Sequence, residues 1–378
     1  MHRTPTRETL RVMARWSKLL VVAVVVGIVV VAAASLFLRG QLRCAGFAGA
    51  MVTAEELPSQ PAPPGSIRLA QWNLRNFPLD ERPQTNDLGF SRRTNICDLE
   101  AVLGGLDADV LGLQEVCDTR RFPPILRRAA GERPMRVLFS DGGGRFGQHL
   151  GIAWDDHALE LAGGPVEITE VALDQGMRPA FAVYLRSRRP GGVDFTFVVV
   201  HLQAGVESFA DRRRQNRALA RWIDEWVDEI GDPDLILLGD FNTTGSPRGG
   251  LEGELQSIDT ILGRAGLYRL PNATGCSEYW EGGGERDGVQ VPSLLDHVFV
   301  RGFGADPVTA PLQAWLHCAR FDCNELVSRQ GEEDGTFWDV SDHCPLTFEI
   351  RDADFEGQNE EFGIRNSELP TRGGDPGD

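Results

Sequence analysis

An acid and an amide stand two residues apart at the end of a short apolar segment. Residues 235–238 are Leu-Ile-Leu-Leu, and Gly239, Asp240, Phe241 and Asn242 follow directly. The apolar run is too short for a helix and is typical of a strand buried on both faces. On an extended backbone, Asp240 and Asn242 point to the same side. This pair suits a metal or phosphate site, although a strand followed by an Asp/Asn turn has the same pattern.

Polar side chains also stand at the ends of other apolar segments. The full set is Asn73, Glu115, His201, Asp240, Asn242, Asp296 and the triplet Ser341-Asp342-His343 before the last apolar segment. Taken alone, each has a structural explanation, such as a turn cap, a solvated strand end or a satisfied core imidazole. Because all of them stand where active sites of layered α/β folds gather, the pattern favours one shared site.

The elements that must position these residues follow from hydrophobic periodicity. Strands are predicted at residues 67–73, 110–115, 136–139, 150–154, 178–184, 195–202, 235–238, 294–300 and 346–350. Helices are predicted at residues 91–106 and 211–230, where apolar side chains recur on one face. Many strands with few helices predict an α/β (α+β) fold of two packed sheets flanked by helices, not a singly wound parallel sheet.

Composition limits the classes of function. The chain has 378 residues, enough for one large domain or two small ones, and a net charge of −17. Such a charge argues against gripping nucleic acid through a basic surface, but not against brief contact with a phosphodiester through a metal ion. Lys18 is the only lysine. Schiff-base chemistry and a Walker-type phosphate loop are therefore excluded from the catalytic domain.

The N-terminal region has the pattern of a membrane anchor. Residues 1–18 are basic, and residues 19–38 are uncharged, almost wholly aliphatic and long enough to cross a bilayer. The excess of positive charge before the segment places the N-terminus in the cytoplasm and everything downstream outside it. A cleaved signal peptide is the alternative, with small-residue cleavage sites at 32–34 and 48–50, and the protein would then be secreted.

The rest of the chain divides by composition. Residues 39–65 form a Pro-rich linker, residues 66–351 a globular domain, and residues 352–378 an acidic, disordered tail. All seven cysteines follow the membrane segment, and an exported location permits disulfides. Cys318 with Cys323, and Cys97 with Cys117, are the candidate pairs. No Cys or His spacing typical of zinc is present in the sequence.

Six short motifs, in chain order, carry a resemblance to a known family. They are Trp72-Asn73, Leu113-Gln114-Glu115, Val200-His201-Leu202, Gly239-Asp240-Phe241-Asn242, Leu295-Asp296-His297 and Ser341-Asp342-His343. Together they resemble the endonuclease/exonuclease/phosphatase superfamily, which includes pancreatic deoxyribonuclease and neutral sphingomyelinases. The resemblance spans nearly the whole globular domain. It implies a four-layer sandwich of two mixed sheets flanked by helices, and Mg²⁺-dependent cleavage of a phosphate ester, with Mn²⁺ as a substitute.

The resemblance and the chemistry of the side chains imply specific roles. Glu115, with help from Asn73 and Asp342, would hold the metal, because Mg²⁺ takes few, hard oxygen ligands from protein. His343, held by Asp296, would deprotonate water or stabilise the phosphorane. The remaining expected roles are water positioning by Asp240, donation to a phosphoryl oxygen by Asn242, and phosphate contacts by His201 and by Arg178 in Met177-Arg178-Pro179. Whether one or two metals act is left open.

The leading functional hypothesis is a membrane-anchored, extracytoplasmic endonuclease, whose partners are a nucleic-acid phosphodiester and the membrane. No protein partner is predicted. A lipid phosphodiesterase or phosphoinositide-type phosphatase is the alternative, and exposed apolar loops at Tyr279-Trp280 or residues 321–338 would favour it. A non-catalytic binding domain is a third possibility, which the intact set of polar residues disfavours. The basic run Arg212-Arg213-Arg214 is expected to be a solvated helix face, and His149, His157 and His297 to be structural.

Overall fold

The described part of the chain begins after the predicted anchor. The computed structural model describes residues 57–58, 60–78, 94–144, 147–173, 176–280, 289–304, 308–327 and 335–353. All of these belong to one unit, Met51–Asp378. The predicted membrane segment, most of the predicted linker and nearly all of the predicted acidic tail lie outside them. Among the described helices, none combines the length and apolar character needed to span a bilayer.

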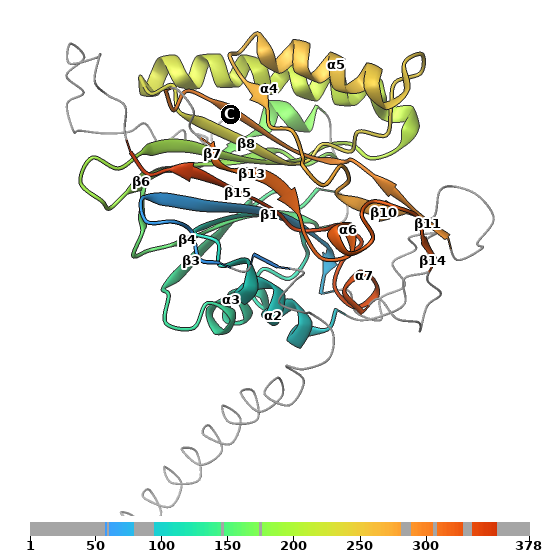
Figure 1. The fold of residues 1–378 in the computed structure, drawn as a ribbon. Helices are drawn as coiled ribbons and strands as arrows, with labels where there is room; N and C mark the ends of the chain where they lie inside the picture. The colour runs from blue at the N-terminus through green and yellow to red at the C-terminus, as the bar shows by residue number, and fades with distance from the viewer. Residues whose placement is uncertain are drawn as a thin grey trace, which may run out of the picture. The chain divides into compact units, whose positions relative to one another are not determined.

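Two six-stranded sheets pack face to face in the described residues (Figure 1). The first has the order β13 (Val308–Ala314), β15 (Leu346–Arg351), β1 (Ser66–Phe77), β2 (Val110–Val116), β4 (His149–Asp155) and β3 (Met135–Phe139). The second has the order β5 (Leu159–Ile168), β6 (Ala180–Ser187), β7 (Asp194–His201), β8 (Leu235–Asp240), β12 (Asp296–Arg301) and β9 (Tyr268–Arg269). Both sheets are mixed, because β1 runs parallel to β2, and β7 to β8, among antiparallel neighbours.

Helices cover the two outer faces of the sheets (Figure 1). The first sheet carries α2 (Ile96–Leu106) and α3 (Phe122–Ala129), and the second carries α4 (Phe209–Ile230) and α5 (Gly250–Gly263). Shorter elements are η2 (Thr169–Ala172), η3 (Val206–Ser208), α6 (His317–Arg320), α7 (Gly335–Asp339) and the small sheet of β10 (Glu278–Trp280), β11 (Val289–Ser293) and β14 (Leu326–Val327). One apolar core lies between the sheets and one under each pair of helices. The predicted arrangement of two mixed sheets flanked by helices is confirmed.

Local signals explain where the helices begin and end. At the start of α2, the side chain of Asn95 accepts hydrogen bonds from the backbone N–H groups of Cys97 and Asp98. At the end of α4, Gly231 takes a left-handed conformation, with φ of 79°, and donates to the carbonyl of Val227. These caps fix where α2 begins and where α4 ends.

The two sheets approach closely near their middle. A Cβ added at Gly112 of β2 would lie 2.5 Å from Leu238 Cδ1 and 3.1 Å from Val199 Cγ2. Glycine at this position lets the central strands of one sheet pack directly on those of the other. The polar residues at the ends of β1, β2, β7 and β8 are thereby brought to one edge of the sandwich.

Several elements differ from the predicted ones. The predicted first strand continues to Phe77, and the predicted strand at 178–184 begins only at Ala180. Neither β5 nor α3 is predicted, because β5 contains Gly-Gly-Pro and α3 opens with Phe-Pro-Pro and has only 8 residues. Proline and glycine weaken the periodic signal, and packing against neighbours decides such segments instead.

Both predicted cysteine pairs are wrong. Cys318 is bonded to Cys344, and Cys323 to Cys276. Cys117 is not in a disulfide, and its Sγ lies 3.9 Å from Asn76 Oδ1. The short sequence separation of Cys318 and Cys323 suggested the first pair. In the fold, α6 instead places Cys318 beside Cys344, just before β15, although these two residues are 26 positions apart in sequence.

Candidate active site

Neighbouring strands of the second sheet place three predicted site residues side by side. The parallel register of β7 and β8 pairs His201 with Asp240, and the antiparallel register of β8 and β12 pairs Asp240 with Asp296. Gly239, just before Asp240, has φ of 138°, and a Cβ there would overlap the carbonyl oxygen of Val200. Only glycine fits this close approach of β7 and β8, which sets where Asp240 projects.

The first sheet contributes Asn73 and Glu115 from the opposite side. Asn73 Nδ2 donates to Asp240 Oδ2 at 3.0 Å, so the two sheets are joined at the site. The backbone N–H of Asn76 donates to Glu115 Oε2 at 2.8 Å. Glu115 has φ of 60°, a left-handed conformation that is costly for a side chain of this kind. The carboxylate is thus held in place by a strained backbone and a direct hydrogen bond.

Asp296 and His343 form a buried pair. His343 Nδ1 lies 2.8 Å from Asp296 Oδ2, and the other oxygen of Asp296 accepts from Gln71 Nε2 at 2.6 Å. Burial alone would lower the pKa of His343, but Asp296, Asp240 and Asp342 together raise it well above 6.5. His343 Nε2 lies 3.8 Å from Asp240 Oδ2. The ring is therefore oriented by one carboxylate and directed at a second.

His201 lies between two carboxylates but is neutral. Its Nε2 is 3.4 Å from Asp240 Oδ2 and 3.6 Å from Glu115 Oε1. Burial, followed by the charges of Arg178 and His343, lowers the pKa of His201 well below 6.5. Its Nδ1 is buried without a partner. A neutral ring with its proton on Nε2 fits these contacts, and that N–H faces the site.

Arg178 reaches the site through residues that the sequence analysis missed. Its Nη1 donates to Gln148 Oε1 at 2.6 Å, and Gln148 Nε2 donates to Asn76 Oδ1 at 2.6 Å. Since Asn76 also holds Glu115, a chain of hydrogen bonds connects the guanidinium to this carboxylate. Gln148 lies in a Gly-rich segment without periodicity, so no sequence signal indicated it. Gln71 did carry one, because it stands two residues before Asn73 on the same face of β1.

Asn242 and Asp342 complete the predicted set. The backbone N–H of Asn242 donates to Asp240 Oδ1 at 2.8 Å, and Asn242 Nδ2 donates to the Leu202 carbonyl at 3.1 Å. Asp342 Oδ1 lies 3.5 Å from Ser341 Oγ, and the charge of Asp342 acts on Glu115 and His343. The structure therefore brings all of the predicted residues together, whereas their individual roles stay predictions.

His297 lies on the other side of β12. Its Nε2 contacts Thr243 Oγ1 at 2.9 Å, and its ring packs against Phe241 with the centroids 5.6 Å apart. Burial lowers the pKa of His297 to about 3. These contacts agree with the expected structural role.

Glu278 is a site residue that the sequence analysis missed. It forms an isolated backbone bridge with His343, and its carboxyl group is buried, with Oε2 lacking any partner. Burial raises the pKa of Glu278 well above 4.5, and the nearby charges of Asp342 and Asp240 act in the same direction. Because β10 is only 3 residues long, it has no periodicity that could have marked this residue.

The donor set fits a divalent cation. Five carboxyl groups gather at this edge of the sandwich: those of Glu115, Asp240, Glu278, Asp296 and Asp342. Burial raises the pKa of Glu115, and that of Asp240 to about 7, so a further positive charge at this edge would favour the ionised carboxylates. Ligand atoms of Asp240, Asp296 and His343 all lie within 4.8 Å of one another. The expected metal ligands adjoin this cluster, because Asn73 is hydrogen-bonded to Asp240 and His201 contacts both Glu115 and Asp240. Carboxylate oxygens are the hard ligands that Mg²⁺ or Mn²⁺ prefers.

The sequence profile of the Endonuclease/Exonuclease/phosphatase family matches residues 70–343. The chain belongs to this family. No curated protein sequence matches it. Among solved structures, this family member is similar to the human Nocturnin catalytic domain with bound sulfate, with a TM-score of 0.51 and 16% identity over 76% of this chain and 95% of that chain. It is also similar to ANGEL2, described as a 2′,3′-cyclic phosphatase, with a TM-score of 0.50 and 15% identity over 76% and 96% of the two chains. At these identities the similarity shows the fold alone.

Proposed function

We propose that this endonuclease/exonuclease/phosphatase-family protein hydrolyses phosphodiester bonds with a divalent cation, Mg²⁺ or Mn²⁺, and acts on nucleic acid as an endonuclease. One observation carries the proposal. The pair Asp296–His343 faces Asp240, which is itself hydrogen-bonded to Asn73 across the two sheets. This arrangement offers a general acid–base group, a water-positioning carboxylate and a cation site within one buried cluster.

Each residue has a task in the proposed hydrolysis. A cation held by Glu115, with Asn73 and Asp342, would supply positive charge beside a phosphoryl oxygen and the leaving alkoxide. Asp240 accepts a hydrogen bond from the attacking water and fixes its direction. His343, oriented by Asp296, donates to the developing phosphorane charge in the protonated form that its raised pKa favours, or takes the proton of that water when it is neutral.

The phosphate group needs donors on its other side. Asn242 Nδ2 uses one hydrogen for the Leu202 carbonyl and keeps the second for a phosphoryl oxygen. The guanidinium of Arg178 and the Nε2–H of neutral His201 add charge and a further donor. These groups stabilise charge that grows in the transition state.

Most of the described aromatic side chains in the loops that would favour a lipid substrate are buried. Tyr279 is 0% exposed and Trp338 only 6%, while Trp280 is 36% exposed. Within the described residues of these loops, one partly exposed ring is a weak surface for entering a membrane. A nucleic-acid substrate is therefore favoured over a lipid.

The location belongs to the same proposal. The sequence of residues 19–38 supports a membrane anchor with the catalytic domain outside the cytoplasm, or a secreted protein if the segment is cleaved. The disulfides Cys276–Cys323 and Cys318–Cys344 support an oxidising compartment. Protease treatment of intact cells would degrade the catalytic domain if it lies outside the cell. Protection of the domain in spheroplasts as well as in intact cells would contradict this location.

A plasmid assay tests the activity. Full-length protein, with the variants Asp240→Asn and His343→Ala, is incubated with supercoiled plasmid in Mg²⁺ and in chelator. We expect nicking by the parent protein that chelator and both substitutions abolish. If the plasmid survives, the nuclease proposal fails, and the same samples are assayed on sphingomyelin and phosphoinositide vesicles. Inactivity on all of these esters would leave the binding-domain hypothesis.

A further inference from the structure

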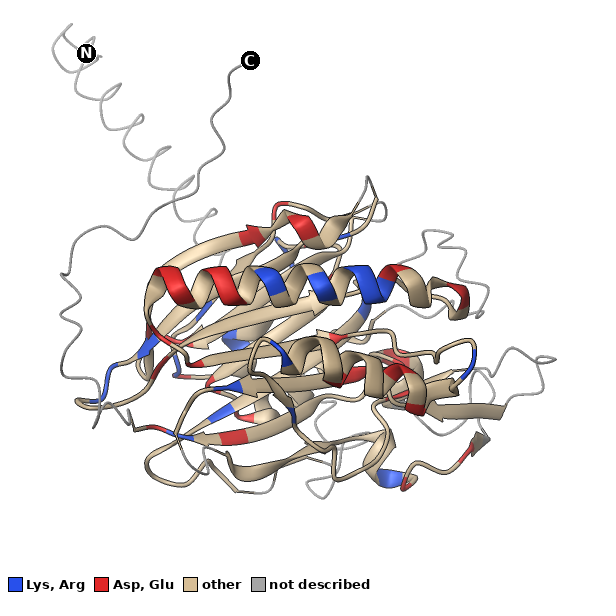
Figure 2. Ribbon diagram, turned by 90° about the horizontal axis from the view of Figure 1, so that it is seen from above, with Lys and Arg blue, Asp and Glu red and all other residues tan. Residues whose placement is uncertain are grey.

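Helix α4 carries its charges in an order that the helix itself does not favour (Figure 2). Apart from Asp211 in the first turn, the arginines at 212, 213, 214, 217 and 221 all come before the acids at 224, 225, 228 and 229. The macrodipole of a helix favours acids near the N-terminus and bases near the C-terminus. Arginines spaced four apart, at 213, 217 and 221, also repel one another. Helix stability therefore does not explain this arrangement.

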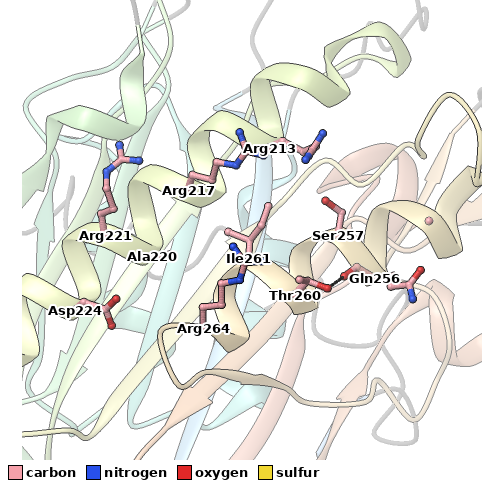
Figure 3. Close-up of a pocket in the computed structure, with 11 residues that line it drawn as sticks. Arg213, Arg217, Ala220, Arg221, Asp224, Gln256, Ser257, Thr260, Ile261 and Arg264 are labelled. Carbon is pink, nitrogen blue, oxygen red and sulfur yellow. Dashed lines mark hydrogen bonds between the residues drawn. The ribbon is translucent and has the colours of Figure 1, made fainter.

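Three of these arginines line a groove between α4 and α5 (Figure 3). The groove has a volume of about 550 Å³. Arg213, Arg217 and Arg221 lie on the α4 side, and Arg264 at the end of α5 adds a fourth guanidinium. In a protein with a net charge of −17, four arginines around one groove form a local positive region.

The groove arginines lack acidic partners among the described residues. Arg213 stacks over the ring of Phe209, and its Nε is buried without a hydrogen-bond partner. The acid that lines the groove, Asp224, lies 3.5 Å from Arg301.

The other arginines of the run are neutralised. Arg212 is fully buried and pairs with Glu254 at 2.7 Å, so the expected solvated face is wrong for this residue. Arg214 is solvated, as expected, and pairs with Asp211 at 3.0 Å. By contrast, no acid among the described residues neutralises the groove arginines, so their positive charge is available to a ligand of opposite charge.

The shape and chemistry of the groove indicate a phosphodiester strand. Guanidinium groups bind phosphate oxygens in a fork-like geometry, and Gln256, Ser257 and Thr260 of α5 offer further polar groups along the other wall. Successive groove arginines are separated by about 6 Å along α4, four residues at 1.5 Å each, which suits a row of phosphates better than one isolated phosphate. A flat bilayer surface would fit a concave groove poorly.

The groove begins near the catalytic edge. Helix α4 starts at Phe209, in the segment that follows His201, and α5 starts at Gly250, after Asn242. Arg212 connects the two segments by donating to the Gly205 carbonyl and to Thr244 Oγ1. We propose that the α4/α5 groove binds the backbone of a nucleic-acid strand at a distance from the scissile bond. This inference rests on the proposed nucleic-acid substrate.

Paired arginine substitutions in the full-length protein test the groove. The groove variant is Arg217→Gln with Arg221→Gln, and the matched control is Arg127→Gln with Arg214→Gln. All four side chains are exposed, and both variants lose the same charge. Anisotropy of a labelled single strand of about 30 nucleotides, longer than common single-strand sites, measures binding in chelator over a range of salt. We expect the groove variant to bind at least about tenfold more weakly, with a salt slope reduced by about 1.4 for two lost phosphate contacts.

The outcomes separate this inference from the proposed activity. Equal binding by the groove variant and the control, or no measurable binding by the parent protein, would overturn the inference even if plasmid is nicked. Loss of binding to vesicles of anionic phospholipid, with oligonucleotide binding unchanged, would assign the groove to a membrane and overturn it too. Weaker oligonucleotide binding by the groove variant would support the groove as a strand-binding site even if the plasmid survives. The unfolding midpoint of the groove variant should be at or above that of the parent, because repulsion within α4 is relieved.

Discussion

At the scale of single residues, the imidazole of His343 is controlled by its hydrogen-bonded carboxylate. Asp296 accepts from Gln71 Nε2 through one oxygen and contacts His343 Nδ1 through the other. Its backbone N–H donates to Ser277 Oγ at 3.0 Å. Because these hydrogen bonds fix the Asp296 carboxylate, it keeps the His343 ring in one orientation and stabilises the positive charge of the protonated ring.

The first prediction concerns this pair. Asp296→Asn should lower kcat by about 10²–10⁴-fold, because the amide no longer stabilises the protonated ring. His343→Ala should be similarly impaired, and the double variant should lose little more than either single one, since the residues act as a unit. Plasmid-nicking rates provide the measurement, and the exposed His157→Ala is the control. A nearly normal rate for Asp296→Asn would show that the pair is not used.

The second prediction concerns Glu278 and pH. Burial raises its pKa in the folded protein well above 4.5. The stability that this group contributes is therefore present below the unfolded pKa and lost as pH rises through the folded pKa. In Glu278→Gln, the free energy of unfolding should fall less between about pH 5 and about pH 8 than in the parent. Urea unfolding in chelator measures it, with the exposed Glu132→Gln as control. The prediction fails if the parent and Glu278→Gln show the same pH dependence.

At the scale of elements, the pairing of β7 with β8 sets the catalytic geometry. The register that joins His201 to Asp240 continues through Val200 and Gly239. The next strand, β12, adds Asp296 opposite Asp240. A change in this register would move three catalytic side chains at once.

The third prediction tests the close approach of these strands. Gly239→Ala should lower the free energy of unfolding by about 4 kcal/mol or more, because its Cβ overlaps the Val200 carbonyl at a φ that alanine avoids. Activity should fall with it. Gly263→Ala, at the end of α5 with open space around the new Cβ, should instead stabilise by about 0.5–1 kcal/mol. Denaturant unfolding of both variants checks the contrast, and a Gly239→Ala protein as stable as the parent would contradict it.

At the scale of the whole molecule, the two sheets concentrate negative charge in one buried place. Asn73 and Glu115 arrive from one sheet, and Asp240 and Asp296 from the other. Folding must bring these groups together at a cost, because burial disfavours the charged forms of Glu115 and Asp240. A bound cation would offset that cost and couple metal binding to stability.

The fourth prediction follows from this coupling. Chelator should abolish hydrolysis and Mg²⁺ should restore it. Mg²⁺ at 100 times its Kd should also raise the free energy of unfolding by about 2.7 kcal/mol through mass action, and with it the unfolding midpoint. Glu115→Gln should remove most of both effects, whereas Glu132→Gln should keep them. Calorimetry with and without Mg²⁺ is the measurement. An unchanged midpoint together with full activity in chelator would argue against a metal enzyme.

The fifth prediction concerns the disulfides. Cys318–Cys344 and Cys276–Cys323 close loops of 26 and 47 residues in sequence separation. Replacing Cys318 and Cys344 with alanine should lower the free energy of unfolding by about 2–4 kcal/mol. Activity should fall as well, because Cys344 directly follows His343. Unfolding and plasmid nicking of the paired variant test this, and an unchanged stability would show that the bond contributes nothing.

The ends of apolar segments were enough to predict much of the site from sequence. Asn73, Glu115, His201, Asp240 and Asp296 each stand at or near a strand end, and such ends meet at one edge of a packed sheet. This information is local, since a strand of buried aliphatics and the polar residue after it are neighbours in the chain. The sequence by itself also determined the two sheets flanked by helices, through the number and period of its apolar segments.

Only the tertiary structure decided which distant groups touch. The segments that contain Gln148, Glu278 and the paired cysteines have short or broken periodicity. The sequence therefore showed neither which side of each segment is buried nor which residues lie next to it. The burial of Arg212, beside the open groove of Arg217, depends on how α5 packs against α4. Periodicity tells which side of an element is apolar, but the strand register and helix packing that select each neighbour are set by contacts across the whole fold.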